Sequence, residues 1–445
     1  MSSIDVNGPS AVPADTAIDP LFRKIAWRLM PFLSVCYLIA QIDRTNISFA
    51  KIEMLTDLNF SDTIYGLGAG IFFLGYCLFE VPANMILKRI GARMWLAILM
   101  FVWGLVSTAT MFITTPASFY AMRFVLGVAE AGFFPGTIYY MTFWFTPRQR
   151  GRMTALFMAS IALSGFIVGP ISGAILHGLG GVAGLKGWQW IFALEGVPAM
   201  LLGILCWFYL DSGPEESSWL THHEKALIAR VLQKEYSAPQ SDKDGVLKTV
   251  LLSPAAWGLS FIYACYGVAF YGVVFWLPTI VKATGVNDPL MIGLLTAIPW
   301  GVSVVVMLVL ASYADRKQNS RKVLVALSVV SAAGFALTLA ANSTAISLLG
   351  LTIAMAGNMA SLPILWNLPT RLFQGYAAGV VIALIASIGN FPGFFAPYLV
   401  GWARDHFGSM DVATYMFIGA MLLAWPLLRA LPQRVDPDHD ARAAP

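Results

Sequence analysis

Long apolar segments separated by short polar stretches run along most of the chain. We interpret twelve of them as membrane-spanning helices, because each has about the 20 residues that cross a bilayer core. The predicted spans are residues 28–50, 64–87, 94–114, 118–141, 153–177, 188–210, 256–281, 289–313, 322–342, 345–367, 376–400 and 412–431. They are apolar on nearly every face, as helices surrounded by lipid must be. The pattern predicts an all-α integral membrane protein.

The twelve spans divide into two sets of six. The predicted parts are a disordered tail at 1–22, an N-terminal half at 23–210, a linker with an amphipathic helix at 211–250, a C-terminal half at 251–431 and a second tail at 432–445. Gly165 and Pro170 in the fifth span correspond to Gly393 and Pro397 in the eleventh. Such paired, Gly- and Pro-interrupted helices are typical of transporters built from internal repeats.

Composition supports a membrane protein and excludes several other classes. The 445 residues are 58% hydrophobic and 12% charged, about half the charge of a soluble domain. A net charge of +4 provides no basic stripe, so we expect no nucleic-acid partner. The four cysteines lie inside apolar segments and predict no disulfide framework. We find no motif for an enzyme, a metal site or a cofactor.

The distribution of basic residues predicts the orientation in the membrane. With a cytoplasmic N-terminus, the external residues among the 28 Lys and Arg are Lys51, Lys186, Lys282 and Arg404. Two more lie within spans, and the remaining 22 are cytoplasmic. This asymmetry follows the positive-inside rule. We therefore expect both termini in the cytoplasm and a location in a bacterial inner membrane.

Four ionisable residues stand out within the predicted spans: Asp43 and Arg44 in the first, Arg123 and Glu130 in the fourth. Each costs roughly 2.5–3.5 kcal/mol on insertion scales, so each is a candidate functional residue. One interpretation is an anion site in which two arginines balance two acids. The alternative is a pair of internal salt bridges, Asp43–Arg44 and Arg123–Glu130, that only hold helices together.

The anion-site interpretation also predicts coupling to protons. A substrate carboxylate would add one negative charge to a balanced cluster, and protonation of Asp43 or Glu130 would restore the balance. Substrate binding and proton uptake would then be one linked equilibrium, as symport requires. Protons are the only coupling species that we expect.

Further polar and aromatic residues could complete the site. Asn390 is the strongest of them, because its amide lies in a helix loosened by Gly389 and Pro392 and needs a partner. Trp and Tyr side chains could instead anchor or pack the helices. We interpret Glu80 and Glu195 as structural or gating acids. The other candidates are Tyr37, Tyr76, Tyr271, Trp276, Asn358, Trp366 and Asn367.

From Arg23 to Leu431 the chain resembles the major facilitator superfamily, and more narrowly its anion–cation symporter family. The narrow resemblance rests on the segments Asp43-Arg44-Thr45-Asn46-Ile47-Ser48 and Arg123-Phe-Val-Leu-Gly127-Val-Ala-Glu130, followed by Ala-Gly-Phe-Phe-Pro135-Gly136. The superfamily's cytoplasmic loop signature is partly kept. Its matching residues are Arg89, Gly91 and Arg93 in the first half and Asp315 and Arg316 in the second. Lys88 stands where the family has an acid, which Glu80 could replace.

The resemblance implies twelve helices and proton-driven uptake of organic anions such as sugar acids, hydroxy-acids or aromatic acids. It implies that Arg44 and Arg123 bind carboxylate or take part in gating, and that Asp43 and Glu130 bind protons. Tyr76 and Asn390 would contact the substrate.

We therefore expect a monomeric, alternating-access symporter that imports a small organic anion, with the lipid bilayer, the substrate and protons as its partners. A uniporter or exchanger without proton coupling is the first alternative. A non-transporting sensor of organic acids is an alternative from another class.

Overall fold

The computed structural model describes residues 18–236, 246–317, 320–373 and 375–432. Every regular element in these ranges is a helix. The helices are α1 (Ile18–Thr45), α2 (Ile47–Leu58), α3 (Asp62–Ile90), α4 (Ala92–Ala109), η1 (Thr110–Phe112), α5 (Pro116–Glu130), α6 (Phe133–Thr142), α7 (Pro147–Leu179), η2 (Val182–Gly184), α8 (Gly187–Tyr209), α9 (His222–Tyr236), α10 (Val246–Leu252), α11 (Pro254–Ala283), α12 (Pro289–Lys317), α13 (Ser320–Leu339), α14 (Thr344–Trp366), α15 (Leu368–Leu372), α16 (Gly375–Phe407) and α17 (Asp411–Ala430).

Within the part of the chain that the structure describes, twelve helical segments are long and apolar enough to cross a membrane, which confirms the predicted fold class. The largest difference from the predicted boundaries is in the first span, which extends over Pro20–Leu58. Helix α1 begins even earlier, at Ile18, so the last five residues of the predicted N-terminal tail are helical. Pro20 fits there because the first helical turn needs no backbone donor. The rest of that tail, and the second tail beyond Pro432, lie outside the described residues.

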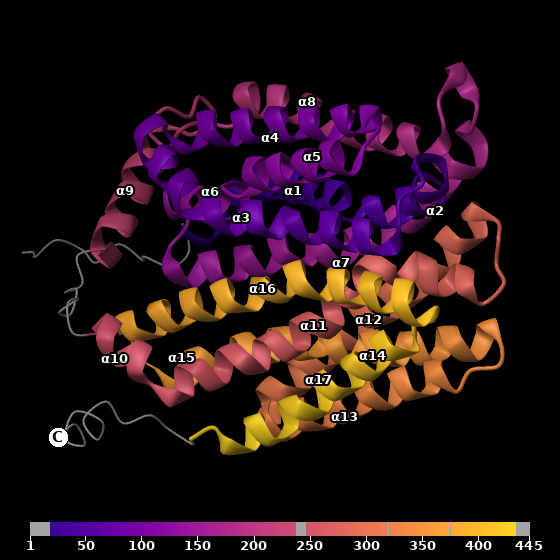
Figure 1. Ribbon diagram of the computed structural model, residues 1–445. Coiled ribbons are helices and arrows are strands. Elements are labelled where there is room, and N and C mark those ends of the chain that lie inside the picture. The colour runs from indigo at the N-terminus through magenta and orange to yellow at the C-terminus, as the bar shows by residue number, and fades with distance from the viewer. Residues whose placement is uncertain (1–17, 237–245, 318–319, 374, 433–445) are drawn as a thin grey trace, which may run out of the picture.

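The helices form two groups (Figure 1). Helices α1–α8, drawn in indigo to magenta, make the first group, and α11–α17, drawn in salmon to yellow, make the second. We call the end of the bundle where α1 begins and α17 ends the terminal end, and the opposite end the far end. The linker between the groups contains α9, the expected helix, and α10.

Helix α9 is tied to the first group by an ion pair. Lys24 of α1 lies 2.8 Å from Glu224, in the first turn of α9. The backbone N–H of Thr221 also donates to Glu224, at 2.8 Å. The hydrogen bonds from Lys24 and Thr221 hold the pKa of this partly exposed carboxyl below its ordinary value. The linker helix thus lies against the terminal end of α1.

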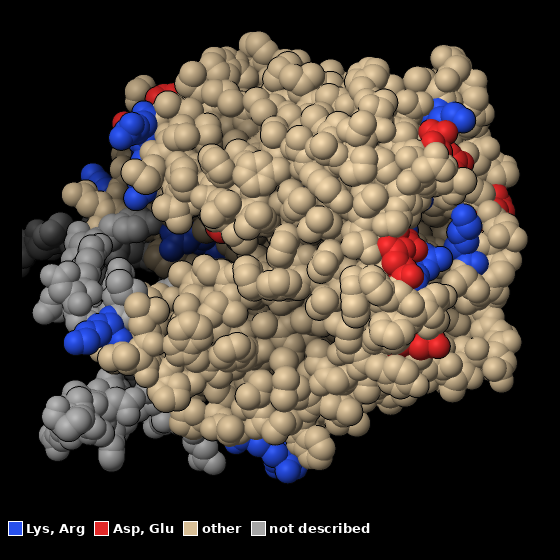
Figure 2. Space-filling view, viewed as in Figure 1, with Lys and Arg blue, Asp and Glu red and all other residues tan. Residues whose placement is uncertain are grey.

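The two groups meet most closely at the far end, where glycines let the helix backbones approach. A Cβ atom on Gly66 of α3 would lie 2.3 Å from the carbonyl oxygen of Pro397 in α16. One on Gly169 of α7 would lie 2.5 Å from the carbonyl oxygen of Gly293 in α12. At the terminal end, Figure 2 shows a hollow between the groups that contains basic side chains. The bundle is therefore closed at the far end and open at the terminal end.

Candidate functional site

Arg44 and Glu130 form an ion pair inside the first group. The Glu130 Oε2 atom accepts hydrogen bonds from Arg44 Nη2 at 2.8 Å and from Arg44 Nε at 3.2 Å. The Glu130 side chain is 1% exposed and that of Arg44 is 18% exposed. The second carboxylate oxygen of Glu130 has no hydrogen-bond partner among the described residues. The arginine is therefore the more exposed partner of the pair.

Two breaks in the helices place this pair. Arg44 is the second-last residue of α1, which ends before Asn46, and Glu130 is the last residue of α5. The fourth span resumes as α6 after Ala131 and Gly132. The sequence pattern predicts both spans as continuous helices. The Gly132-Phe-Phe-Pro135 segment, which begins two residues after Glu130, was the available signal for the second break.

The side chain of Asp43 contacts different residues from those that its neighbour Arg44 contacts. Its carboxylate accepts from Ser107 Oγ at 2.8 Å and from Trp103 Nε1 at 3.2 Å, both on α4. Asp43 is fully buried, and both of its donors are neutral. A buried acid with only neutral partners is a natural place for a proton, because an unpaired buried charge is costly.

Arg123 is fully buried and forms no ion pair with any described residue. Its Nε atom donates to the carbonyl oxygen of Gly68 at 3.4 Å, and both terminal nitrogens have no hydrogen-bond partner among the described residues. The salt bridges of the structural alternative, Asp43–Arg44 and Arg123–Glu130, are therefore wrong. The reason is that Arg44 reaches Glu130 directly across the first group.

Phe72 of α3 links the two arginines. Its ring centroid lies 5.0 Å from the guanidinium carbon of Arg44 and 5.0 Å from that of Arg123. Tyr76, one turn further along α3, places its ring 5.0 Å from the Arg44 guanidinium carbon. Tyr76 is a candidate from the sequence and Phe72 is not, although residues four apart share a helix face. Tyr37 stacks on Phe157, with the ring centroids 4.3 Å apart.

The second group contributes Asn390 and Tyr271, which lie beside α3 at Phe73. The Tyr271 hydroxyl donates to Asn390 Oδ1 at 3.2 Å. The Tyr271 ring also packs edge-on against Phe73, with the centroids 4.7 Å apart. Asn390 therefore has the partner that its amide requires, and it lies close to the α3 segment that carries Phe72.

Three candidates from the second group lie elsewhere. Trp276 packs against Lys51 at the far end, with the Lys51 Nζ atom 3.0 Å from its ring centroid. Asn358 donates to the carbonyl oxygen of Tyr266 at 3.1 Å, within the second group. Trp366 packs edge-on against Tyr263, with the centroids 5.1 Å apart. None of these three contacts joins them to the arginines.

The loop-signature residues lie at the terminal end. Gly91 links α3 to α4 with φ of +86°, a conformation that favours glycine. Arg93 donates from Nε to the carbonyl oxygen of Trp207, near the end of α8, at 2.9 Å. Glu80 is partly buried and Arg89 is exposed. The side chains of the second-half pair, Asp315 and Arg316, lie outside the described part of the structure.

Comparison with known proteins assigns the family. The family model for the Major Facilitator Superfamily matches residues 33–397. The chain belongs to the major facilitator superfamily. Because the family and the relatives described below are transporters, the chain is a membrane transporter and not an enzyme. Among the described residues, no group of three or more His, Cys, Asp or Glu side chains could hold a metal ion.

Two relatives match this superfamily member along nearly its whole length. A protein of Pseudomonas putida, provisionally named as the metabolite transport protein NicT, is 40% identical over 95% of this chain and 96% of its own. A protein of Agrobacterium vitis, provisionally named as a tartrate transporter, is 40% identical over 94% of this chain and 92% of its own.

A solved structure of the xylose transporter XylE from E. coli shares the fold. It has a TM-score of 0.71 at 15% identity, and the match covers 91% of this chain and 98% of that one. The likeness at this level of identity concerns the fold alone.

Proposed function

We propose that this transporter imports a small organic anion together with protons by alternating access. The observation that carries the proposal is the buried ion pair between Arg44 and Glu130, with an arginine beside it, Arg123, whose terminal nitrogens have no described partner. Two arginines at one site favour anionic cargo over a neutral or cationic compound.

Arg44 is the proposed contact for the substrate carboxylate. Its side chain is the more exposed member of the ion pair, and the guanidinium can bind a carboxylate through two parallel hydrogen bonds. When Arg44 turns to the substrate, Glu130 loses the donor of both hydrogen bonds to its Oε2 atom. The buried carboxylate must then pair with Arg123 or bind a proton, because an unpaired buried charge is costly.

Proton binding at Glu130 couples the movement of protons to the transport of substrate. The substrate brings a negative charge into the site and the proton compensates it, so each favours binding of the other. Asp43 is the second proposed proton site, since its two partners, Ser107 and Trp103, are neutral donors. The proposed direction places the terminal end in the cytoplasm of a bacterium and the far end outside, following the distribution of basic residues.

The proposed substrates are hydroxy-acids such as tartrate, sugar acids and aromatic acids. The relative provisionally named as a tartrate transporter supports the first class. The rings of Phe72, Tyr76 and Tyr271 near the arginines provide apolar area for an aromatic acid. A thermal-shift screen of the purified protein against tartrate, gluconate and benzoate would find the class that binds, because a bound ligand stabilises the folded state.

Gradient-driven uptake distinguishes symport from the alternatives. Proteoliposomes with an alkaline interior are mixed with the radiolabelled acid that gave the largest thermal shift. Accumulation above the external concentration, lost when the pH gradient is abolished, supports symport. Uptake that stops at equal internal and external concentrations and does not depend on pH would indicate a uniporter or exchanger. Binding without uptake would indicate a sensor.

A further inference from the structure

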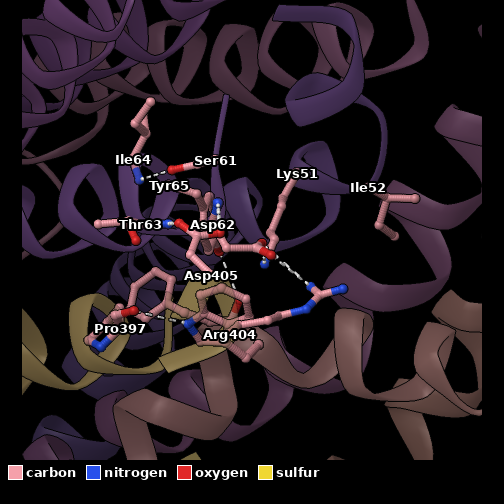
Figure 3. A network of polar contacts seen from close by, with 12 residues as sticks. Lys51, Ile52, Ser61, Asp62, Thr63, Ile64, Tyr65, Pro397, Arg404 and Asp405 are labelled. Carbon is pink, nitrogen blue, oxygen red and sulfur yellow. Dashed lines mark hydrogen bonds and ion pairs between the residues drawn. The ribbon is translucent and has the colours of Figure 1, made fainter. Parts of the chain in front are cut away.

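A network of charged side chains joins the two groups at the far end (Figure 3). Asp62, the first residue of α3, lies at its centre. Its carboxylate pairs with Lys51 of α2 at 2.9 Å and with Arg404 of α16 at 3.3 Å. Arg404 belongs to the second group, so the carboxylate of Asp62 bridges one cation from each group.

A carboxylate of the second group also caps a helix of the first. Asp405 of α16 accepts from the backbone N–H of Asp62 at 3.2 Å and from that of Thr63 at 2.8 Å. The first N–H groups of a helix have no partner within it, and an acid beside them also interacts favourably with the helix dipole. The N-terminus of α3 is therefore satisfied partly by the other group.

Lys51 is held by aromatic rings as well as by Asp62. Its side chain is 3% exposed, and its Nζ atom lies 3.0 Å from the ring centroid of Trp276 and 4.5 Å from that of Tyr65. Both rings connect the groups, because Trp276 of α11 packs edge-on against Tyr65 of α3, with the centroids 5.3 Å apart. The Tyr65 hydroxyl also donates to the carbonyl oxygen of Phe275 in the second group at 2.8 Å. Trp276 Nε1 donates to the carbonyl oxygen of Pro397 at 3.3 Å, within the second group.

A small cavity lies between the groups on the inner side of this network. Its lining includes Ser48 of α2, opposite Val274 and Trp300 of the second group. Ser48 precedes Lys51 by three residues, which is about 4.5 Å along a helix. The network therefore stands between this cavity and the far end.

We propose that Lys51, Asp62, Arg404 and Asp405 form the outer gate of the transporter, and that Asp62 is the residue that keeps it closed. This inference rests on the proposed alternating-access function. For the far end to open, Asp62 must separate from Arg404, and the α3 N-terminus must leave Asp405. Loss of the Asp62 charge therefore favours the outward-open state.

Labelling of a single introduced cysteine tests the gate without a substrate. The parent variant carries Ser48→Cys. The measured quantity is the rate at which a membrane-impermeant maleimide labels this cysteine in right-side-out vesicles. The same reaction on the unsubstituted protein gives the background from the native cysteines. Adding Asp62→Asn is expected to raise the labelling rate roughly fivefold or more, the effect of losing one or two kcal/mol of closed-state stability.

Asp57→Asn is the matched control. Asp57 pairs with Lys186 at 3.2 Å, and both residues belong to the first group at the far end. Breaking this ion pair removes the same charge without disconnecting the groups, so the labelling rate should stay at the parent value. Equal rates for Asp62→Asn and Asp57→Asn would overturn the proposal.

The orientation of the vesicles and a second variant distinguish the ways in which the gate proposal could fail. Labelling that rises only in inside-out vesicles would overturn the proposed orientation, and with it the assignment to the outer face. If Asp62→Asn does not fold, as judged by its thermal unfolding, Lys51→Met replaces it and removes the cation that lies against Trp276 of the second group. Lys51→Met should likewise speed labelling from outside, and an unchanged rate in that variant would overturn the gate.

Discussion

The guanidinium of Arg44 lies 2.8 Å from the carboxylate of Glu130, 86 positions away, while Asp43 faces Ser107 and Trp103. Adjacent residues of one helix point in different directions, so Arg44 and Asp43 have separate partners. In the proposed mechanism, the ion pair opens to admit a substrate carboxylate while Asp43 keeps its own hydrogen bonds. This separation gives two acids in different environments, as a coupled anion and proton site requires.

Glu130→Gln should abolish gradient-driven uptake and keep substrate exchange. The amide cannot bind the proton that compensates the substrate charge, but its oxygen can still accept a hydrogen bond from Arg44. Exchange is measured as counterflow of labelled substrate into preloaded proteoliposomes. Gradient-driven accumulation at the wild-type level in this variant would remove Glu130 from the coupling mechanism.

Glu195→Gln is the matched control for that experiment. Glu195 is also a buried acid of the first group, and it accepts from the Ser172 hydroxyl at 2.7 Å. Its hydrogen-bond partner, Ser172, belongs to another helix of the same group. We therefore expect Gln at this position to preserve packing and gradient-driven uptake. Loss of uptake in both variants would show that the assay responds to any buried acid.

Arg123→Lys should lower the initial uptake rate roughly tenfold to hundredfold, because hydrogen bonds to charged groups are worth about 1.5–3 kcal/mol. A lysine keeps the charge but cannot present two parallel donors to a carboxylate. The measurement is initial uptake at fixed pH, with the purified variant's thermal unfolding as a check on folding. A rate within twofold of wild type would show that charge alone suffices at this position.

Phe72→Leu should reduce uptake severalfold by removing the ring that both arginines contact. A cation over an aromatic face is stabilised by about 0.5–2 kcal/mol, depending on desolvation. Phe79→Leu, on the same helix with an exposed side chain, provides the comparison. If the two variants transport equally well, the ring of Phe72 has no part in holding the arginines.

Gly127→Ala should destabilise the first group by about 1–3 kcal/mol. A Cβ atom there would lie 2.0 Å from the carbonyl oxygen of Phe72, which belongs to the backbone of α3. Gly419→Ala, in the interior of α17, meets no atom within 4 Å and should be neutral or slightly stabilising. Thermal unfolding in detergent compares them, and equal midpoints would contradict the close packing of α3 on α5.

The spans were predictable because lipid requires long apolar helices. Charged residues are rare within such spans, so Arg44, Arg123, Asp43 and Glu130 could be identified as candidates from the sequence. Their pairing was not predictable. A helix that is apolar on nearly every face carries no signal for its rotation about its own axis, and the break at Asn46 left no Gly or Pro signal. The same lack of a rotational signal explains why Trp276 was expected near the arginines but packs against Lys51.

The far-end network was missed for a different reason. Lys51 and Arg404 were counted only as external basic residues, and Asp62 lies outside the predicted spans. Their contact depends on the close approach of α3 and α16, which are far apart in the sequence. Only the packed helices bring these three charges together.

In the proposed mechanism, one anion and at least one proton move together through the site of Arg44 and Glu130. The most direct measurement is the interior pH of proteoliposomes that contain a trapped pH-sensitive dye, after addition of the acid found in the thermal-shift screen. The proposed mechanism predicts interior acidification that saturates with the acid and disappears in Glu130→Gln. Uptake of the labelled acid by the wild type without acidification would contradict it.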